Sequence, residues 1–137
     1  MIKISKAAWD TMVSHVEGTF PKEGCGLMIG SAGVVEEAVP VPNSYTGPQE
    51  DFFVIDPKDL HRVDRESREK GLDVLGVFHS HPDCDAYFSE TDLKNSCPWY
   101  SFVVLSIQNG RFHHANSWLP DAEQTHADKE ELTWPES

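Results

Sequence analysis

The N-terminal part of the chain carries apolar residues first at strand spacing and then at helical spacing. Ile2–Ile4 is short and largely apolar, which predicts a strand, and Ser5 is a residue type that caps helices. Residues 6–17 then place their apolar side chains on one stripe of a helix: Ala8, Met12, Val13 and Val16. Gly18 and Pro21 end the predicted helix.

Short apolar runs bounded by glycine predict strands in the next part of the chain. Cys25–Gly30 (CGLMIG) and Gly33–Asn43 are predicted to pair as a hairpin that turns through residues 31–33. The loop-forming residues Gly and Pro within residues 43–50 predict a surface loop. Asp51–Asp56 (DFFVID) is again apolar at its centre and is predicted to form a further strand.

A second helix and a buried strand follow. Pro57 at the first helical position and Gly71 after the last one predict a helix over residues 58–70. Leu72–Phe78 is almost continuously apolar, which is typical of a strand covered on both faces. Residues 89–97 are predicted to form a short helix.

The end of the chain predicts a hairpin and a tail. Residues 101–107 and 111–119 form two strands joined by a turn at Asn109-Gly110. Together the elements predict an α/β (α+β-like) fold, with a mixed β-sheet flanked by helices in one domain over residues 1–120. Asp121–Ser137 is polar and acidic, and we expect a loosely ordered tail or a short terminal helix.

Composition and charge narrow the classes of function. The formal net charge is −12 over 137 residues, and such a surface repels phosphate backbones, so we expect no nucleic-acid partner. No apolar run reaches the roughly 18 residues of a membrane span, and the N-terminus has no signal-peptide core, so we expect no membrane association. Three cysteines without a CxxC pair predict reduced thiols and a cytoplasmic location.

Two histidines follow the buried strand, in the stretch GVFHSHPDCDAYFSETD. Alternate residues of a strand point to the same side, so His79 and His81 project together while Ser80 points away. Two converging imidazoles are suitable ligands for zinc. Structural histidines that only make hydrogen bonds are the simpler alternative for an isolated His-x-His.

A predicted helix N-terminus with an acidic residue follows shortly after the histidines in the sequence. Ser89-x-x-Asp92 resembles a capping box, which predicts a helix beginning here with Asp92 in its first turn. Asp92 could be the third ligand, and two nitrogens and one oxygen would leave the fourth zinc position to water, as in catalytic sites. Capping alone would also explain both Ser89 and Asp92.

At this point the sequence resembles a known family, the JAMM (MPN+) zinc metallopeptidases. His79-Ser80-His81-Pro82 followed by six residues and then Ser89-x-x-Asp92 is similar to that family's signature. The family also has a glutamate just before a short apolar strand, and Glu23 in PKEGCGLMIG matches it. The resemblance extends over about residues 18–107 and is strongest to the small standalone prokaryotic members.

The resemblance implies roles for individual residues. His79, His81 and Asp92 would ligate Zn²⁺, Glu23 would move a proton from water to the leaving amine, and Ser89 would stabilise the tetrahedral intermediate. The implied fold is similar to that of cytidine deaminases, although the Pro-Cys-x-x-Cys motif of those enzymes is absent.

The resemblance also implies an activity, which is hydrolysis of the peptide or isopeptide bond after a C-terminal Gly-Gly. The substrate would be a ubiquitin-like sulfur-carrier protein, trimmed at its C-terminus or freed from an attached amino acid. The loop around Asn43 and Ser44 is our candidate for one wall of the substrate groove.

Other functions remain open at the level of the sequence. A non-catalytic module of this fold could dock a carrier protein without cleaving it, although such relatives usually lack a ligand or the glutamate. A metal hydrolase acting near nucleic acid would also use a His-x-His site, but the acidic composition disfavours it. Cys84, between the histidines and Asp92, could compete as a ligand, but we expect a small, partly buried thiol.

Overall fold

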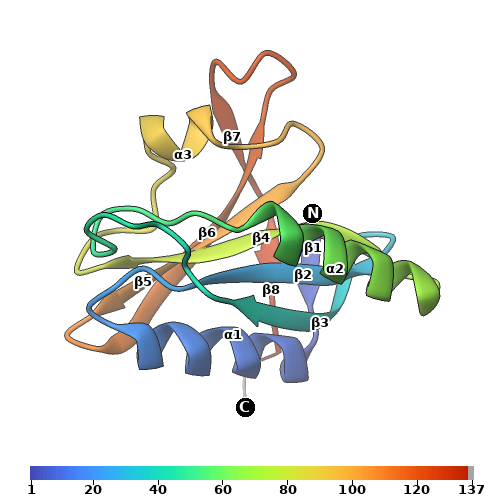
Figure 1. Ribbon diagram of the computed structural model, residues 1–137, viewed down its shortest axis with the longest axis horizontal. Coiled ribbons are helices and arrows are strands. Elements are labelled where there is room, and N and C mark those ends of the chain that lie inside the picture. Colours follow the sequence, from blue (N-terminus) through green and yellow to red (C-terminus); the bar gives the residue numbers. More distant parts are fainter. Residues whose placement is uncertain (136–137) are drawn as a thin grey trace.

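Eight strands form one mixed sheet in the computed structural model, which describes residues 1–135 (Figure 1). In chain order the elements are β1 (Ile2–Ile4), α1 (Lys6–Thr19), β2 (Cys25–Ser31), β3 (Val34–Val41), α2 (Pro57–Glu69), β4 (Asp73–Pro82), α3 (Glu90–Lys94), β5 (Ser101–Gln108), β6 (Arg111–Pro120), β7 (Ala127–Glu130) and β8 (Leu132–Thr133). The strand order is β7-β6-β5-β4-β2-β3-β1-β8. β4 runs parallel to β5, and β1 runs parallel to β3 and β8, whereas the remaining pairs are antiparallel. The predicted mixed sheet with flanking helices is therefore confirmed.

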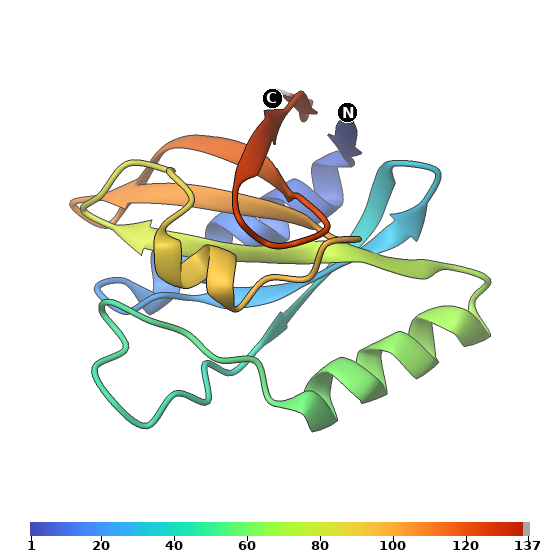
Figure 2. The same cartoon turned by 90° about the horizontal axis from the view of Figure 1, so that it is seen from above.

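The two long helices cover opposite faces of the sheet (Figure 2). The α1 face holds the larger group of buried apolar side chains, which includes Ile4, Trp9, Met12, Phe78, Val103 and Leu105. The α2 face holds a smaller group, which includes Leu27, Ile29, Val63, Val77 and Phe102. Burial on both faces explains why β4 is almost continuously apolar rather than alternating.

An irregularity in β4 decides which face receives the histidines. The register between β2 and β4 shifts between Met28 and Ile29, so that Leu75 is an extra residue in β4. Gly76 lies beside this bulge, where a Cβ would collide with the backbone carbonyl of Ser101 on β5. After the bulge, Val77 packs on the α2 face and Phe78 on the α1 face. The alternation therefore directs His79 and His81 to the α2 side.

The two long helices begin within one residue of their predicted starts. The Ser5 side chain accepts a hydrogen bond from the Ala8 N–H at the start of α1 (3.2 Å). Asp56 caps α2 in the same way by accepting from the Lys58 N–H (2.9 Å). α3 is shorter than predicted. It begins after its Ser89 cap and ends at Lys94.

The predicted β5–β6 turn is also confirmed. Asn109 and Gly110 both have left-handed backbone angles, with φ of 54° and 81°. Both central positions of a tight I′ hairpin turn require such angles, and Asn and Gly are the residues that adopt them most readily.

The predicted strand over residues 51–56 is wrong. This segment has no partner strand, because β2 and β3 are already paired with other strands. The Asn43 side chain takes the place of a partner: its Nδ2 donates to the Phe52 carbonyl and its Oδ1 accepts from the Val54 N–H. Phe53 and Ile55 are half-buried and pack against the α2-side core from above the sheet. The apolar pattern reflects this packing rather than a position in the sheet.

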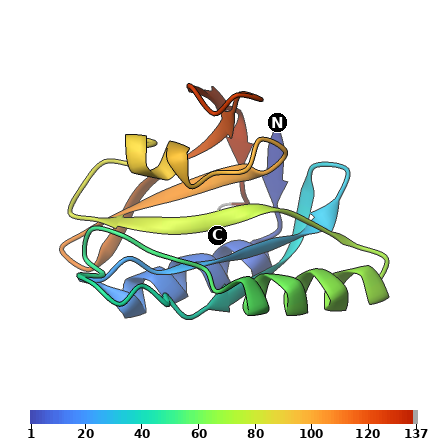
Figure 3. The ribbon, with the colours of Figure 1, turned by 45° about the horizontal axis from the view of Figure 1, so that its top comes forward.

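The predicted loose or helical C-terminal tail is wrong, because this segment forms two strands. β7 pairs with β6 at one edge of the sheet, and β8 pairs with β1 at the other edge (Figure 3). The Ile2 N–H donates to the Glu131 carbonyl (2.9 Å), and Trp134 stacks on Trp9 with ring centroids 4.2 Å apart. Backbone pairing at two open edges orders this polar segment, which its side chains alone did not indicate. The last two residues of the predicted tail lie outside the described residues.

Over residues 1–135, none of the helices combines the length and the apolar character needed to cross a bilayer.

Candidate active site and metal centre

His79 and His81 meet at the end of β4, as the strand period predicts. Their Nε2 atoms lie 3.3 Å apart, and both side chains are almost completely buried. Ser80 points to the other face, where its hydroxyl accepts a hydrogen bond from the Gly24 N–H (2.9 Å). His81 Nδ1 lies 2.9 Å from the Asp85 carbonyl, so that this nitrogen carries the proton and leaves the Nε2 lone pair free.

α3 brings a carboxylate to the histidine pair. The Ser89 hydroxyl accepts from the Asp92 N–H (3.0 Å), and Asp92 Oδ2 accepts from the Ser89 N–H (3.1 Å), which completes the predicted capping box. Asp92 Oδ2 also lies 3.4 Å from His79 Nε2 and 3.2 Å from His81 Nε2. The cap therefore holds the carboxylate in the orientation that faces both imidazoles.

The three ligand atoms form a triangle of the size that a metal ion requires. Its sides measure 3.3, 3.4 and 3.2 Å. In a tetrahedral zinc site with bonds of about 2.0–2.1 Å, neighbouring ligand atoms lie about 3.3 Å apart. The donor set of two imidazole nitrogens and one carboxylate oxygen also suits zinc and several other divalent ions. These residues could therefore hold one metal ion, although the donor set does not select which.

Glu23 completes the cluster from a distant part of the sequence. One carboxylate oxygen of Glu23 and one ring nitrogen each of His79 and His81 lie within 4.8 Å of one another. The adjoining Gly24 pairs with Ser80 in both directions, through its N–H and its carbonyl. Glu23 is 6% exposed, and its Oε1 has no hydrogen-bond partner within residues 1–135. A buried carboxylate oxygen without a donor is costly, which indicates that a bound group supplies one.

Burial and mutual contacts shift the pKa values of these groups. Burial raises the pKa of Glu23 to about 8, even though the neighbouring His81 acts in the opposite direction. Burial lowers the pKa of His79. Burial alone would raise the pKa of Asp92, but the charge and hydrogen bonds of His79 and His81 outweigh it and hold this pKa well below its usual range. Displaced pKa values of this kind are typical of functional sites.

The raised pKa of Glu23 predicts a pH-dependent stability of the metal-free protein. The pKa rises from 4.5 to about 8 on folding, so this group's contribution is fully present below pH 4.5 and is lost as the pH rises through about 8. Glutamine does not titrate. We therefore expect Glu23→Gln to increase the free energy of unfolding at pH 8, by on the order of 2 kcal/mol relative to wild type. Urea unfolding between about pH 5 and 8 measures this difference, and a constant difference across that range would contradict the expectation.

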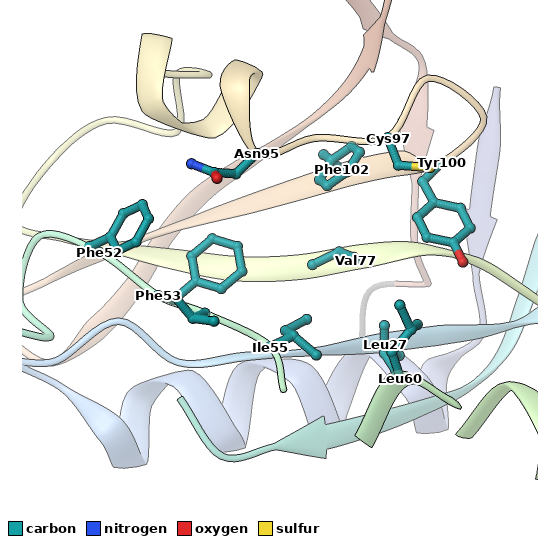
Figure 4. Close-up of a pocket in the computed structure, with 11 residues that line it drawn as sticks. Leu27, Phe52, Phe53, Ile55, Leu60, Val77, Asn95, Cys97, Tyr100 and Phe102 are labelled. Carbon is teal, nitrogen blue, oxygen red and sulfur yellow. The ribbon is translucent and has the colours of Figure 1, made fainter. Parts of the chain in front are cut away.

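One pocket contains His81, and a second reaches His79 through Phe53. A polar pocket of about 260 Å³ contains Glu23, His81, Ser89 and Asp92, and Tyr87 packs there against the His81 ring with centroids 4.9 Å apart. An apolar pocket of about 290 Å³ is lined by Phe53, which stacks on His79 (Figure 4). Its residues come from the 52–55 segment, from α2, from β2, β4 and β5, and from the α3–β5 connection: Leu27, Phe52, Phe53, Val54, Ile55, Leu60, Val77, Asn95, Cys97, Tyr100 and Phe102.

Phe53 connects the apolar pocket to the site and was not identified from the sequence. Its ring stacks on the His79 ring, with centroids 4.5 Å apart and an interplanar angle of 25°. The apolar run within residues 51–56 could have identified a buried aromatic residue, but it indicated a strand instead. Tyr87 was also missed, since a single tyrosine in a loop carries no signal of its own.

Asn43 and Ser44 lie beside the site rather than in the polar pocket. The Asn43 Nδ2 donates to the Glu23 carbonyl (3.2 Å) as well as to the Phe52 carbonyl, so this side chain links the two segments. The Ser44 hydroxyl and N–H both donate to the Val54 carbonyl. Substrate binding by these two residues stays a prediction. Cys84, which was expected to be partly buried, is exposed and lines the polar pocket.

Gln124 in the C-terminal segment is hydrogen-bonded to the end of α3, the helix that carries Asp92. Gln124, between β6 and β7, donates from its Nε2 to the Ser96 carbonyl (2.8 Å) and the Leu93 carbonyl (3.3 Å). None of the α3 residues is buried, so packing contributes little to its position. α3 itself is therefore held mainly by the histidine pair at Asp92 and by Gln124, while Phe88 and Cys97 on its flanks pack against the α2-side core.

These contacts predict the effect of removing the Gln124 side-chain amide. We expect Gln124→Ala to increase amide hydrogen exchange at residues 93–97 by about 5–10-fold, because each lost hydrogen bond contributes about 1 kcal/mol. Exchange in the strands of the core should not change. Exchange measured by mass spectrometry on the metal-free protein tests this, and unchanged protection of residues 93–97 would contradict it.

Comparisons with known proteins assign the chain to a family. The family described as prokaryotic homologs of the JAB domain matches residues 5–120. A desampylase of Haloferax volcanii is 31% identical over 127 residues, which cover 88% of this chain and 89% of that protein. A probable TtuB-protein conjugate cleaving protease of Thermus thermophilus is 34% identical over 72% of this chain and 65% of its own. A CysO-cysteine peptidase of Mycobacterium tuberculosis is 28% identical over 80% of this chain and 75% of its own.

Solved structures share the fold. A protein of Desulfitobacterium hafniense superposes with a TM-score of 0.85 at 29% identity, over 100% of this chain and 94% of that one. A JAB1/MPN domain protein from Archaeoglobus fulgidus superposes with a TM-score of 0.62 at 19% identity, over 99% and 98% of the two chains, which is a likeness of fold. The chain therefore belongs to the family of prokaryotic JAB-domain homologues, the JAMM (MPN+) metallopeptidases that its His79–Asp92 signature resembles.

Proposed function

We propose that this protein is a zinc-dependent isopeptidase or peptidase that hydrolyses the bond after a C-terminal Gly-Gly of a ubiquitin-like sulfur-carrier protein. The observation that carries the proposal is the triangle of His79, His81 and Asp92 ligand atoms. Beside it lies Glu23, whose Oε1 has no hydrogen-bond partner within residues 1–135. Membership of the family supports hydrolysis as the type of reaction. Relatives named for the cleavage of TtuB conjugates and of a CysO–cysteine product support a carrier protein as substrate.

The metal is assigned to the three ligand residues. His79 and His81 would bind through Nε2 and Asp92 through Oδ2, the atoms that face one another. A zinc ion, when bound, supplies a Lewis acid that polarises the scissile carbonyl and makes water nucleophilic near pH 7. The His81 Nδ1–H and the Asp85 carbonyl fix the ring orientation that this binding needs.

Glu23 is the proposed general base and acid. Its carboxylate lies next to both histidines and has a free oxygen, so it can accept a proton from the attacking water. Burial favours the protonated form of Glu23, which helps this carboxyl group to hold the proton until it passes to the departing amine. Asp92 is the other acid of the polar pocket that lies close to both imidazoles, and it is assigned to the metal, which leaves Glu23 for proton transfer.

Ser89 is proposed to stabilise the oxyanion as well as to cap α3. Its oxygen accepts from the Asp92 N–H, which leaves its own hydroxyl proton free to donate into the polar pocket that it lines. We expect Ser89→Ala to lower kcat by about 10²–10³-fold, the usual effect of losing one oxyanion donor. Ser89→Thr keeps both the hydroxyl and the cap, so it should restore most of kcat. A Ser89→Ala variant with normal kcat would reduce Ser89 to a capping role.

The different chemistry of the two pockets indicates how the substrate tail is oriented across the site. The apolar pocket joins the site at Phe53 and can receive an apolar side chain that precedes the two glycines of the tail. Glycines have no side chains and so let an extended tail pass close to the buried histidines. Absence of nucleic-acid and membrane partners and a cytoplasmic location stay predictions.

Release of the C-terminal group tests the proposed function directly. The zinc-loaded protein is incubated with a ubiquitin-like carrier bearing a Gly-Gly-X tail, and mass spectrometry follows the loss of X. We expect cleavage after the second glycine that a chelator stops and added zinc restores. Binding of the carrier without release of X would instead identify a non-catalytic docking module.

A further inference from the structure

The loop that follows the histidine pair is held by the neighbouring hairpin. Residues 83–88 connect β4 to α3 without regular secondary structure, beside the β5–β6 hairpin (Figure 2). The Asp83 N–H donates to the Ile107 carbonyl (2.7 Å), and the Asn109 N–H donates to Asp83 Oδ1 (2.9 Å). The start of the loop is therefore fixed to the hairpin directly after β4 ends.

Three side chains in one row across β4, β5 and β6 face this loop. His81 is paired with Ser106 on β5, and Ser106 is paired with His114 on β6. Residues directly opposite one another on paired strands point to the same face of a sheet, so these side chains lie side by side. The Ser106 hydroxyl, at the centre of the row, donates to the Cys84 carbonyl of the loop.

The two histidines at the ends of the row contact the two sides of one peptide group. His81 Nδ1 lies 2.9 Å from the Asp85 carbonyl, and the Ala86 N–H donates to His114 Nε2 (3.1 Å). The Asp85 carbonyl and the Ala86 N–H belong to the same planar peptide bond, so the position of one fixes the direction of the other. His114 therefore holds the group that orients the His81 ring.

The hydrogen bonds also assign the proton of the His114 ring. Because Nε2 accepts from the Ala86 N–H, the neutral ring carries its proton on Nδ1. His114 Nδ1 lies 2.7 Å from His113 Nδ1, which can accept this proton in a hydrogen bond. The Asp85 carboxylate is farther away, with Oδ1 4.0 Å from His114 Nε2. Donors therefore point in one direction from His81 to His113, and hydrogen bonds in such a chain polarise one another.

β6 holds the same loop segment at a second point. Asn116 Nδ2 and Trp118 Nε1 both donate to the Ala86 carbonyl, at 3.1 Å each. Ala86 is 1% exposed, although the preceding Asp85 is exposed. Side chains of a single strand therefore satisfy both the N–H and the carbonyl of this buried residue, which leaves the backbone little freedom to move. The carbonyl that His81 contacts is fixed in place as a result.

Resting on the proposed function for the metal, we propose that His114 is a positioning residue: it holds the Asp85–Ala86 peptide group, which in turn orients the ligand His81. A fixed Asp85 carbonyl keeps the His81 proton on Nδ1, so that the Nε2 lone pair faces His79 and Asp92. Groups that accept the second N–H of a metal-binding histidine influence metal affinity strongly. Here that influence extends one peptide bond farther, to the acceptor nitrogen of His114.

Two substitutions of His114 separate its acceptor nitrogen from its ring. His114→Phe keeps a planar ring that fills the space beside the loop but cannot accept from the Ala86 N–H. His114→Gln places an amide oxygen near the position of Nε2 and so can accept again. His61→Phe is the matched control, because it makes the same change at an exposed position of α2.

Zinc affinity and the exchange of one proton are measured for each variant. Competition with a chromophoric chelator gives the affinity, and NMR of the zinc-loaded protein follows the exchange of the His81 Nδ1 proton with water. We expect His114→Phe to weaken zinc affinity about fivefold and to speed this exchange by a similar factor, which is the effect of one hydrogen bond. His114→Gln should restore both values to within about twofold of wild type, and His61→Phe should match wild type.

A folded His114→Phe protein with wild-type affinity and exchange overturns the inference. Equal losses in His114→Phe and His114→Gln also overturn it, because the ring rather than the acceptor nitrogen would then matter. In the wild-type protein, NMR should show the His114 proton on Nδ1 and a coupling across the hydrogen bond from the Ala86 nitrogen to Nε2. A proton on Nε2 overturns the inference whether or not the variants fold. If wild type binds no zinc at His81, the proposed function fails and the inference with it.

Discussion

Replacing Glu23 by glutamine should abolish nearly all turnover while leaving the metal in place. Glutamine keeps the size and the hydrogen-bonding carbonyl of the side chain but can neither accept the proton of water nor give it to the amine. Loss of a general acid–base group lowers kcat by about 10²–10⁴-fold. The assay is cleavage of the Gly-Gly-X carrier, run together with a measurement of zinc content.

The result depends on separating chemistry from metal loading. Glu69→Gln removes an exposed acid of α2 and should keep wild-type kcat and zinc content. Full activity in Glu23→Gln would remove Glu23 from the mechanism. Loss of zinc in this variant would instead make Glu23 a ligand, a possibility that its proximity to both histidines allows.

Replacing His79 by alanine should remove the metal as well as the activity. His79 is completely buried, and its Nε2 forms two sides of the ligand triangle, at 3.3 Å from His81 Nε2 and 3.4 Å from Asp92 Oδ2. Even groups outside the ligand shell cost 10–100-fold in metal affinity when they are changed, so loss of a ligand should cost more than about 100-fold. Competition with a chromophoric chelator measures the zinc affinity.

An exposed histidine provides the control for this variant. His61 lies on the solvent side of α2, and His61→Ala should bind zinc as tightly as wild type. His79→Ala also removes a ring that packs against Phe53, so its folding is checked by circular dichroism. A folded His79→Ala protein with undiminished zinc affinity would refute the ligand assignment.

Local patterns in the sequence predicted a large part of the site. The two-residue period of a strand places His79 and His81 on one side, and their Nε2 atoms are 3.3 Å apart. The Ser89-x-x-Asp92 capping box was also visible in the sequence, because both of its hydrogen bonds lie within one turn of helix. Such features depend on neighbours within about four residues, which a single sequence records.

Long-range features escaped the local patterns. Glu23 reaches the histidines only because β2 pairs with β4, and the resemblance to a family, rather than its spacing, identified it. Residues 51–56 have strand-like spacing but lie on top of the sheet, since Asn43 satisfies their backbone. The C-terminal strands are polar, and β8 is ordered by pairing with β1, which lies more than 100 residues earlier in the sequence. In each case the local sequence does not show which distant residue or strand the segment will contact.

Anomalous diffraction at the zinc edge, from crystals of the zinc-loaded protein, is the most direct measurement of the central claim. The account predicts one strong peak about 2.0–2.2 Å from His79 Nε2, His81 Nε2 and an oxygen of Asp92, with Glu23 nearby but not bound. A protein crystallised with excess zinc that shows no peak between these side chains, or a peak held by other residues, would contradict it.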